Sequence, residues 1–153
     1  MTRPVLLASR SLILALVLAL VLPASAGAND RSLKSALATW SRQIKLDARS
    51  VGLSASRRHP QRMTGRARTF RVDALRARRA VSSIRASSVR GRQAQKLATT
   101  AFGDYARVGR EWELTGRARV AGSKSGASAH AKLATRYAKA ANRLLVQAAK
   151  LVR

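Results

Sequence analysis

A row of arginines is the feature of this sequence whose residue type and spacing best suit a chemical task. Arg71, Arg78, Arg85 and Arg92 recur every seven residues, which would place them along one edge of a helix, beside its apolar side. Guanidinium groups bind phosphate and carboxylate oxygens through paired hydrogen bonds. With the neighbouring Arg68, the row predicts a contact site for polyanions. An ordinary solvated face in an arginine-rich protein is the competing interpretation.

A second basic surface is expected near the C-terminus, on the side of a helix opposite its apolar residues. Its members are Lys132, Arg136, Lys139, Arg143 and Lys150. Helices with one cationic and one apolar face adsorb to anionic membrane surfaces. The apolar face here consists mainly of alanine and leucine, which favours packing inside a helical bundle over insertion into lipid.

Three of the six acidic residues lie close together, but their spacing favours structure over catalysis. Asp104, Glu111 and Glu113 fall within ten positions. Asp104 and Arg107 are three residues apart, and Arg107 and Glu111 are four, which are the spacings of ion pairs within a helix. We therefore expect local charge compensation in place of acid–base catalysis.

The remaining motifs predict neither an enzyme nor a cofactor or metal site. The chain has no cysteine, and His59 and His130 belong to no metal-ligand spacing. The segment 122–126 contains Gly, Lys and Ser but does not match a phosphate-binding loop, and is expected to be a flexible linker. Trp40 and Trp112 lie on apolar helix faces, which predicts core packing in place of stacking on bases or sugars.

The N-terminus has the three parts of a secretory signal peptide. Arg3 and Arg10 precede an uncharged stretch at 11–22, and Pro23 is followed by small residues. Ala24 and Ala26 fit the small-x-small pattern before a cleavage site, so residues 1–26 are predicted to be removed. The localisation is then secreted or in the extracytoplasmic envelope. An uncleaved membrane anchor is the minor alternative, because the apolar run is shorter than the roughly 20 residues of a spanning helix.

Charge sets the strongest limit on the remaining residues, 27–153. They hold 29 basic and six acidic residues, a net charge of about +23. Such a charge opposes compaction by self-repulsion and favours anionic polymers and membrane surfaces as partners. Without cysteines, an exported chain must fold by packing alone.

Apolar residues recur at intervals of three and four, which predicts an all-α protein with a single helical domain. We expect helices at about 30–57, 63–88, 92–120 and 128–152, the first capped by Asn29 or Asp30. Four helices of similar length joined by short connections indicate an antiparallel up-down bundle. The alternative has three helices with one long middle helix, because Gly91 alone does not end a helix.

These features together predict a non-enzymatic exported protein whose basic helical surface contacts an anionic lipid, glycan or wall polymer. Non-specific binding of extracellular nucleic acid is one alternative, since phosphate contacts need only positive charge. Binding to an acidic protein partner is another, with charge accelerating the encounter. All three need the same basic surface, so the sequence does not separate them.

Overall fold

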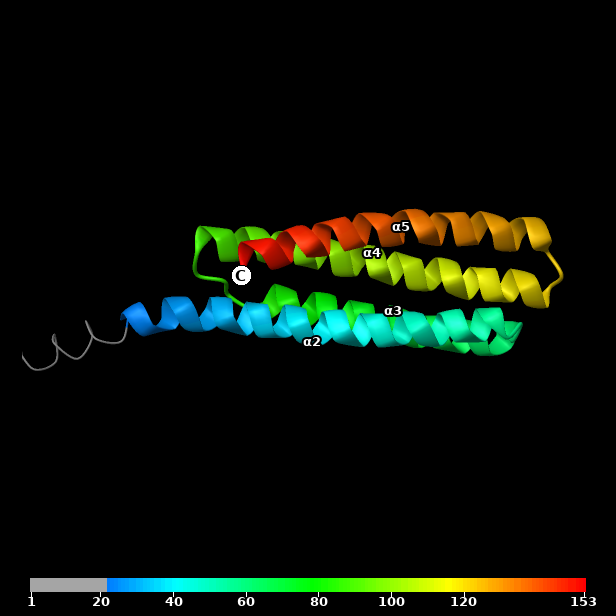
Figure 1. The fold of residues 1–153 in the computed structure, drawn as a ribbon, viewed down its shortest axis with the longest axis horizontal. Helices are drawn as coiled ribbons and strands as arrows, with labels where there is room; N and C mark the ends of the chain where they lie inside the picture. The colour runs from blue at the N-terminus through cyan, green and yellow to red at the C-terminus, as the bar shows by residue number, and fades with distance from the viewer. Residues whose placement is uncertain (1–21) are drawn as a thin grey trace, which may run out of the picture.

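The computed structural model describes residues 22–153, with side chains from residue 27 on, and all regular secondary structure within that range is helical. Its four helices are α2 (Leu22–Ser56), α3 (Pro60–Ser83), α4 (Val89–Val120) and α5 (Lys124–Leu151) (Figure 1). The prediction of an all-α protein with four packed helices is confirmed. The alternative with a single long middle helix is wrong, because the chain leaves helical geometry between Ser83 and Val89.

The first helix begins earlier than the sequence predicts. α2 starts at Leu22, and Pro23 lies in its first turn, where a missing N–H costs no hydrogen bond. Ala24 and Ala26 also belong to this helix. Residues 1–21, with most of the expected leader, lie outside the described residues, so the signal peptide stays a prediction. Within residues 22–153, no helix is long and apolar enough to cross a membrane.

Short connections with clear local causes join the helices. Between α2 and α3, Arg58 takes a positive φ of 54°, and Pro60 opens α3. α3 ends at Ser83, five residues before the expected boundary, and Ile84 is extended. The Ser88 hydroxyl then caps α4 by accepting the N–H of Gly91 at 2.8 Å.

The segment expected to be a flexible linker belongs largely to α5. Gly122 has a φ of 73°, which suits glycine, and Ser123 caps the helix by accepting the N–H of Gly126. Residues 124–126 therefore form the first turn of α5. The expected linker was too long because the capping role of Ser123 was overlooked.

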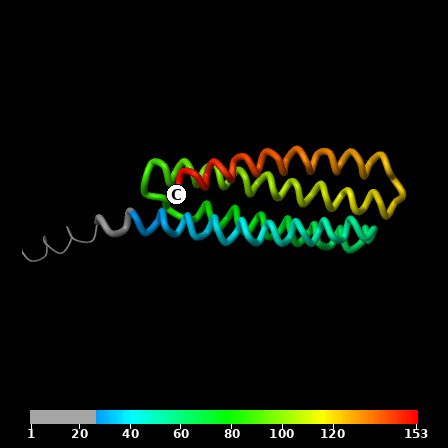
Figure 2. Tube along the Cα trace, in the orientation of Figure 1, coloured from blue at the N-terminus to red at the C-terminus, as the bar shows by residue number. Residues whose placement is uncertain are grey.

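The helices pack as two pairs, α2 with α3 and α4 with α5, joined along α3 and α4 (Figure 2). α2 makes little contact with α4, and little or none with α5. The largest fully buried side chains include Phe70, Phe102, Leu33, Val51 and Val108. On α5 an alanine is buried every seven residues, at Ala127, Ala134, Ala141 and Ala148. Such small side chains let helices approach closely.

The closest approach joins α3 to α4. A Cβ atom at Gly109 would lie 2.7 Å from Cβ of Arg71 and 2.9 Å from its Cα and backbone nitrogen. The two helix backbones are therefore separated by less than a side chain at this point. This contact fixes the register in which the charged residues of α3 meet those of α4.

Candidate anion-binding surface

The predicted arginine row does not lie along one helix. Arg71 and Arg78 are on α3, Arg85 is in the connection after it, and Arg92 is on α4. The reason is the early end of α3 at Ser83, which breaks the seven-residue register. Arg92 also donates from Nη1 to the carbonyl oxygen of Ser87 at 2.6 Å.

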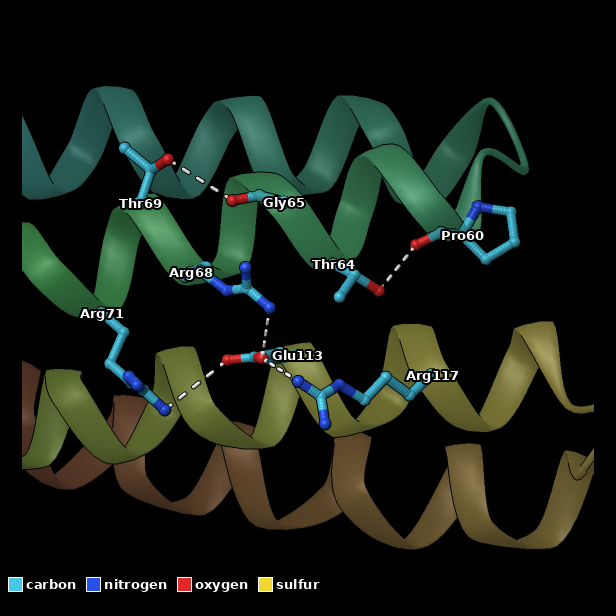
Figure 3. Close-up of polar contacts among 8 residues, drawn as sticks. All are labelled: Pro60, Thr64, Gly65, Arg68, Thr69, Arg71, Glu113 and Arg117. Carbon is cyan, nitrogen blue, oxygen red and sulfur yellow. Dashed lines mark hydrogen bonds and ion pairs between the residues drawn. The ribbon is translucent and has the colours of Figure 1, made fainter.

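Part of the row holds the bundle together. Figure 3 shows Arg68 and Arg71 from α3 meeting Arg117 around Glu113 on α4. The Nη2 atoms of Arg68 and Arg117 lie 3.3 and 2.6 Å from Oε1 of Glu113, and Nη1 of Arg71 lies 3.6 Å from Oε2. Glu113 is only 5% exposed. Two of the five predicted polyanion contacts thus already have an internal carboxylate partner.

The other acidic residues of α4 also have basic partners. Asp104 pairs with Arg107 at 3.1 Å, which confirms the predicted ion pair. Glu111 does not pair with Arg107; its Oε2 lies 2.7 Å from Nδ1 of His130 on α5. The guanidinium of Arg107 instead lies 5.6 Å from the ring centroid of Tyr137. These contacts join neighbouring turns and helices, and each of the three carboxylates of α4 has a basic partner.

Asp30 caps a helix other than its own. Its Oδ1 accepts the backbone N–H of Ser87 at 3.0 Å, beside the N-terminus of α4. The hydrogen bond from the Ser88 side chain is the main reason that the pKa of Asp30 is lowered, with further bonds from Ser87. This stabilisation is present above the ordinary pKa and is lost as pH falls through the lowered value. The sequence suggested Asp30 as a cap for the first helix, which instead begins eight residues earlier.

Asp47 on α2 has the opposite electrostatic environment. Burial raises its pKa above 3.8, and the negative charge of Asp73 on α3 raises it further. Gln43 donates to Oδ1 at 3.0 Å, while Oδ2 is buried without a hydrogen bond. Ionised Asp47 therefore costs stability in the folded chain, because the folded state binds its proton more tightly than the unfolded state.

We expect Asp47→Asn to raise the melting temperature at pH 7, because the amide removes the buried charge and its repulsion with Asp73. The advantage should shrink at acidic pH, because the Asp47 carboxyl becomes protonated as pH falls through its raised pKa. Thermal unfolding followed by circular dichroism at both pH values measures this. Asp104→Asn is the control, since it removes an ion pair with an exposed arginine and should change stability by less than about 1 kcal/mol. A lower melting temperature for Asp47→Asn at pH 7 would contradict this account.

Ten of the exposed cations form two stripes, one on α5 and one on α2. The α5 stripe consists of Lys132, Arg136, Lys139, Arg143 and Lys150, and the α2 stripe consists of Arg31, Lys34, Arg42, Lys45 and Arg49. All ten residues are exposed, and none forms an ion pair within the described chain. Each stripe covers 18 residue steps, about 27 Å along its helix. The α2 stripe was missed, although its spacing of three, eight, three and four residues keeps it on one helix face.

α5 carries the least compensated charge in the molecule. It contains no Asp or Glu, and its four buried alanines face the core while the α5 stripe faces solvent. The prediction that this helix packs inside a bundle is confirmed. Its packing leaves all five cations of the stripe available to a partner.

The two tryptophans lie at the core, and the two histidines lie far apart along the chain. Trp40 and Trp112 pack against the core, as expected, and the ring centroids of Trp112 and Phe70 are 5.0 Å apart. His59 precedes α3, far along the chain from His130 on α5. From Gly27 to Arg153, no three His, Asp or Glu side chains come together as a metal site would require.

Comparison with known proteins returns nothing: no family model matches the chain, and no curated protein or solved structure is detectably similar to it.

Proposed function

We propose that this chain is an exported, antiparallel up-down bundle that acts without catalysis by binding anionic surfaces of the cell envelope or its surroundings. Phosphate-bearing lipid headgroups are the ligands that we favour, and acidic wall polymers or glycans present the same chemistry. The observation that carries the proposal is the segregation of charge. Ten cations form two exposed stripes without ion pairs, while the acidic residues interact with other groups of the bundle.

The excess of positive charge is large even after internal pairing. Of the 29 basic residues from Gly27 on, five pair with Asp or Glu, namely Arg68, Arg71, Arg76, Arg107 and Arg117. Twenty-four therefore remain available for external anions. A folded bundle needs no such excess for its own stability, because like charges repel.

The spacing within a stripe favours collective binding. Neighbouring cations are mostly three or four residues apart, about 5–6 Å along the helix, which is shorter than the screening length of roughly 8 Å at physiological salt. Each Lys or Arg near an anionic membrane contributes about 1 kcal/mol. Five residues of one stripe would thus contribute about 5 kcal/mol, enough for firm but salt-sensitive adsorption.

The α5 stripe is the main contact in this proposal. Arg68 and Arg71 of the sequence-predicted row interact with Glu113, and Arg92 with a carbonyl oxygen, so only Arg78 and Arg85 have no polar partner within the described chain. The row therefore contributes mainly to the general positive field. The stripe, by contrast, combines full exposure with the absence of any acidic residue on its helix.

A five-residue glutamine variant of the α5 stripe should bind vesicles containing phosphatidylglycerol roughly 4,000-fold more weakly than wild type. Glutamine keeps a high helix propensity, so the fold should persist, which circular dichroism checks. Vesicle co-sedimentation measures the affinity, with phosphatidylcholine vesicles as the neutral surface.

The matched control removes the same charge from exposed, unpaired positions outside both stripes, by changing to glutamine the residues Arg57, Arg62, Arg79, Arg90 and Arg110. We expect the affinity of this control for the vesicles to fall about tenfold, because only the general positive field of the protein is weakened. Equal losses in the two variants would overturn the assignment to α5. Unchanged binding in both would overturn the electrostatic mechanism.

A further inference from the structure

An apolar groove opens between α2 and α5, the two outer helices that make little or no contact with each other. Its volume is about 410 Å³, within the range of about 300–1,000 Å³ typical of small-molecule sites. Phe70, Val108 and Trp112 from α3 and α4 lie among its lining residues. Phe70 and Val108 are at most 1% exposed, so the groove is closed beneath and open to the outside.

The walls of the groove are apolar and partly formed by small residues. α2 contributes Ile44 and Ala48, and α5 contributes Ala138 and Leu145. The two alanines leave space that larger side chains would fill if this were an ordinary seam between helices. Apolar recesses of this volume are typical of small-molecule sites.

The polar residues of the lining suit one negative charge. Lys45 is the only cation among them, and the lining contains no carboxylate. The Tyr105 hydroxyl donates to Oδ1 of Asn142, which holds the amide so that its nitrogen can donate to a ligand. Ser41 already donates its hydroxyl to the carbonyl oxygen of Leu37 at 2.6 Å. One ammonium and one amide donor beside an apolar floor match a single carboxylate on an apolar chain.

We propose that this groove binds one fatty acid, with the acyl chain along Trp112 and Leu145 and the carboxylate at Lys45. A second copy of this protein would bring a like charge of about +23 against the groove. A partner helix would find too short a surface, because the lining residues of α2 run only from Ser41 to Ala48, about 10 Å. The site shares Lys45 with the α2 stripe but has no residue in common with the α5 stripe, which is the main contact that we propose for anionic surfaces.

The experiment uses the chain purified after export, carrying Trp40→Phe, so that Trp112 in the groove is its only tryptophan. Titration with dodecanoate should change the Trp112 emission in a saturable manner with one site per chain. Across octanoate, decanoate and dodecanoate, each added CH₂ should tighten binding about fourfold while the groove still has room. A signal that never saturates, or shows no dependence on chain length, would overturn the proposal.

Two pairs of variants locate the site. Ala138→Leu fills the groove and should weaken the binding of dodecanoate at least about tenfold. Ala129→Leu, on the exposed side of the same helix, should leave this binding unchanged. Lys45→Gln should weaken the binding of dodecanoate about three- to fivefold and leave the binding of uncharged dodecanol unchanged. Lys34→Gln, which removes the same charge from the α2 stripe outside the groove, should have no effect. Equal effects within either pair would place the ligand elsewhere.

The outcome is distinguishable from that of the surface proposal. The α5-stripe variant should bind dodecanoate as wild type does, because none of its five residues lines the groove. Ala138→Leu should in turn bind phosphatidylglycerol vesicles normally. Loss of vesicle binding and loss of fatty-acid binding in the same variant would show that the two sites are not separate.

Discussion

Gly109→Ala should destabilise the bundle by about 2 kcal/mol, although alanine is the better helix former. In a solvent-exposed helix the same substitution stabilises the helix by about 1 kcal/mol. At position 109 the new Cβ would lie 2.7 Å from Cβ of Arg71 and 2.9 Å from its backbone. A backbone cannot rotate aside as a side chain does, so α3 and α4 must separate, and overpacking of this kind costs about 1–3 kcal/mol or more.

Gly65→Ala is the matched control for this prediction. Gly65 lies in α3, is exposed, and has no atom within 4 Å of a Cβ added there. We therefore expect it to stabilise the chain by up to about 1 kcal/mol. Urea unfolding of both variants measures the difference, which should be about 3 kcal/mol. Two stabilised variants would show that α3 and α4 do not approach as closely as described.

Phe102→Ala should cost about 3–5 kcal/mol, the largest effect of any single truncation that we expect. Phe102 is fully buried, and its ring lies 6.4 Å from that of Tyr105. Much of the remaining core consists of alanine, so few large side chains are present to collapse into the cavity. Domains of this size have a total stability of about 5–15 kcal/mol, which makes such a loss decisive.

Val89→Ala is the control for the aromatic truncation. Val89 is 73% exposed at the start of α4, so its loss should change stability by less than about 0.5 kcal/mol. Equilibrium unfolding in urea, with the far-ultraviolet circular dichroism signal as readout, compares the two variants. A cost below about 1 kcal/mol for Phe102→Ala would contradict the placement of this ring in the core.

Local signals in the sequence were sufficient to predict the helices. Apolar spacings of three and four, the proline at position 60 and the serines before α4 and α5 mark where helices lie and where they begin. One boundary failed because a local signal, the Ser123 cap of α5, was overlooked, whereas the role of Asp30 depends on a partner elsewhere in the fold. Asp30 looks like a cap for its own helix, yet its carboxylate serves the N-terminus of α4, 57 residues away along the chain.

The candidate site was only partly predictable, because a charge pattern does not reveal which charges are already paired. The seven-residue arginine row looked continuous, but the break after Ser83 divides it, and Glu113 interacts with Arg68 and Arg71. The α2 stripe was readable from spacing alone and was overlooked. The groove between α2 and α5 depends on which helices pack together, which no single helix pattern encodes.

The most direct test of the surface proposal is a competition at about 150 mM salt, where charges are screened over roughly 8 Å. The labelled chain would be offered phosphatidylglycerol vesicles and duplex DNA together, with phosphatidylcholine vesicles as control. We predict capture by the anionic vesicles and progressive release as salt is raised. Preference for DNA would instead support extracellular nucleic-acid binding. Binding to neither would contradict the account and leave an acidic protein as the partner to seek.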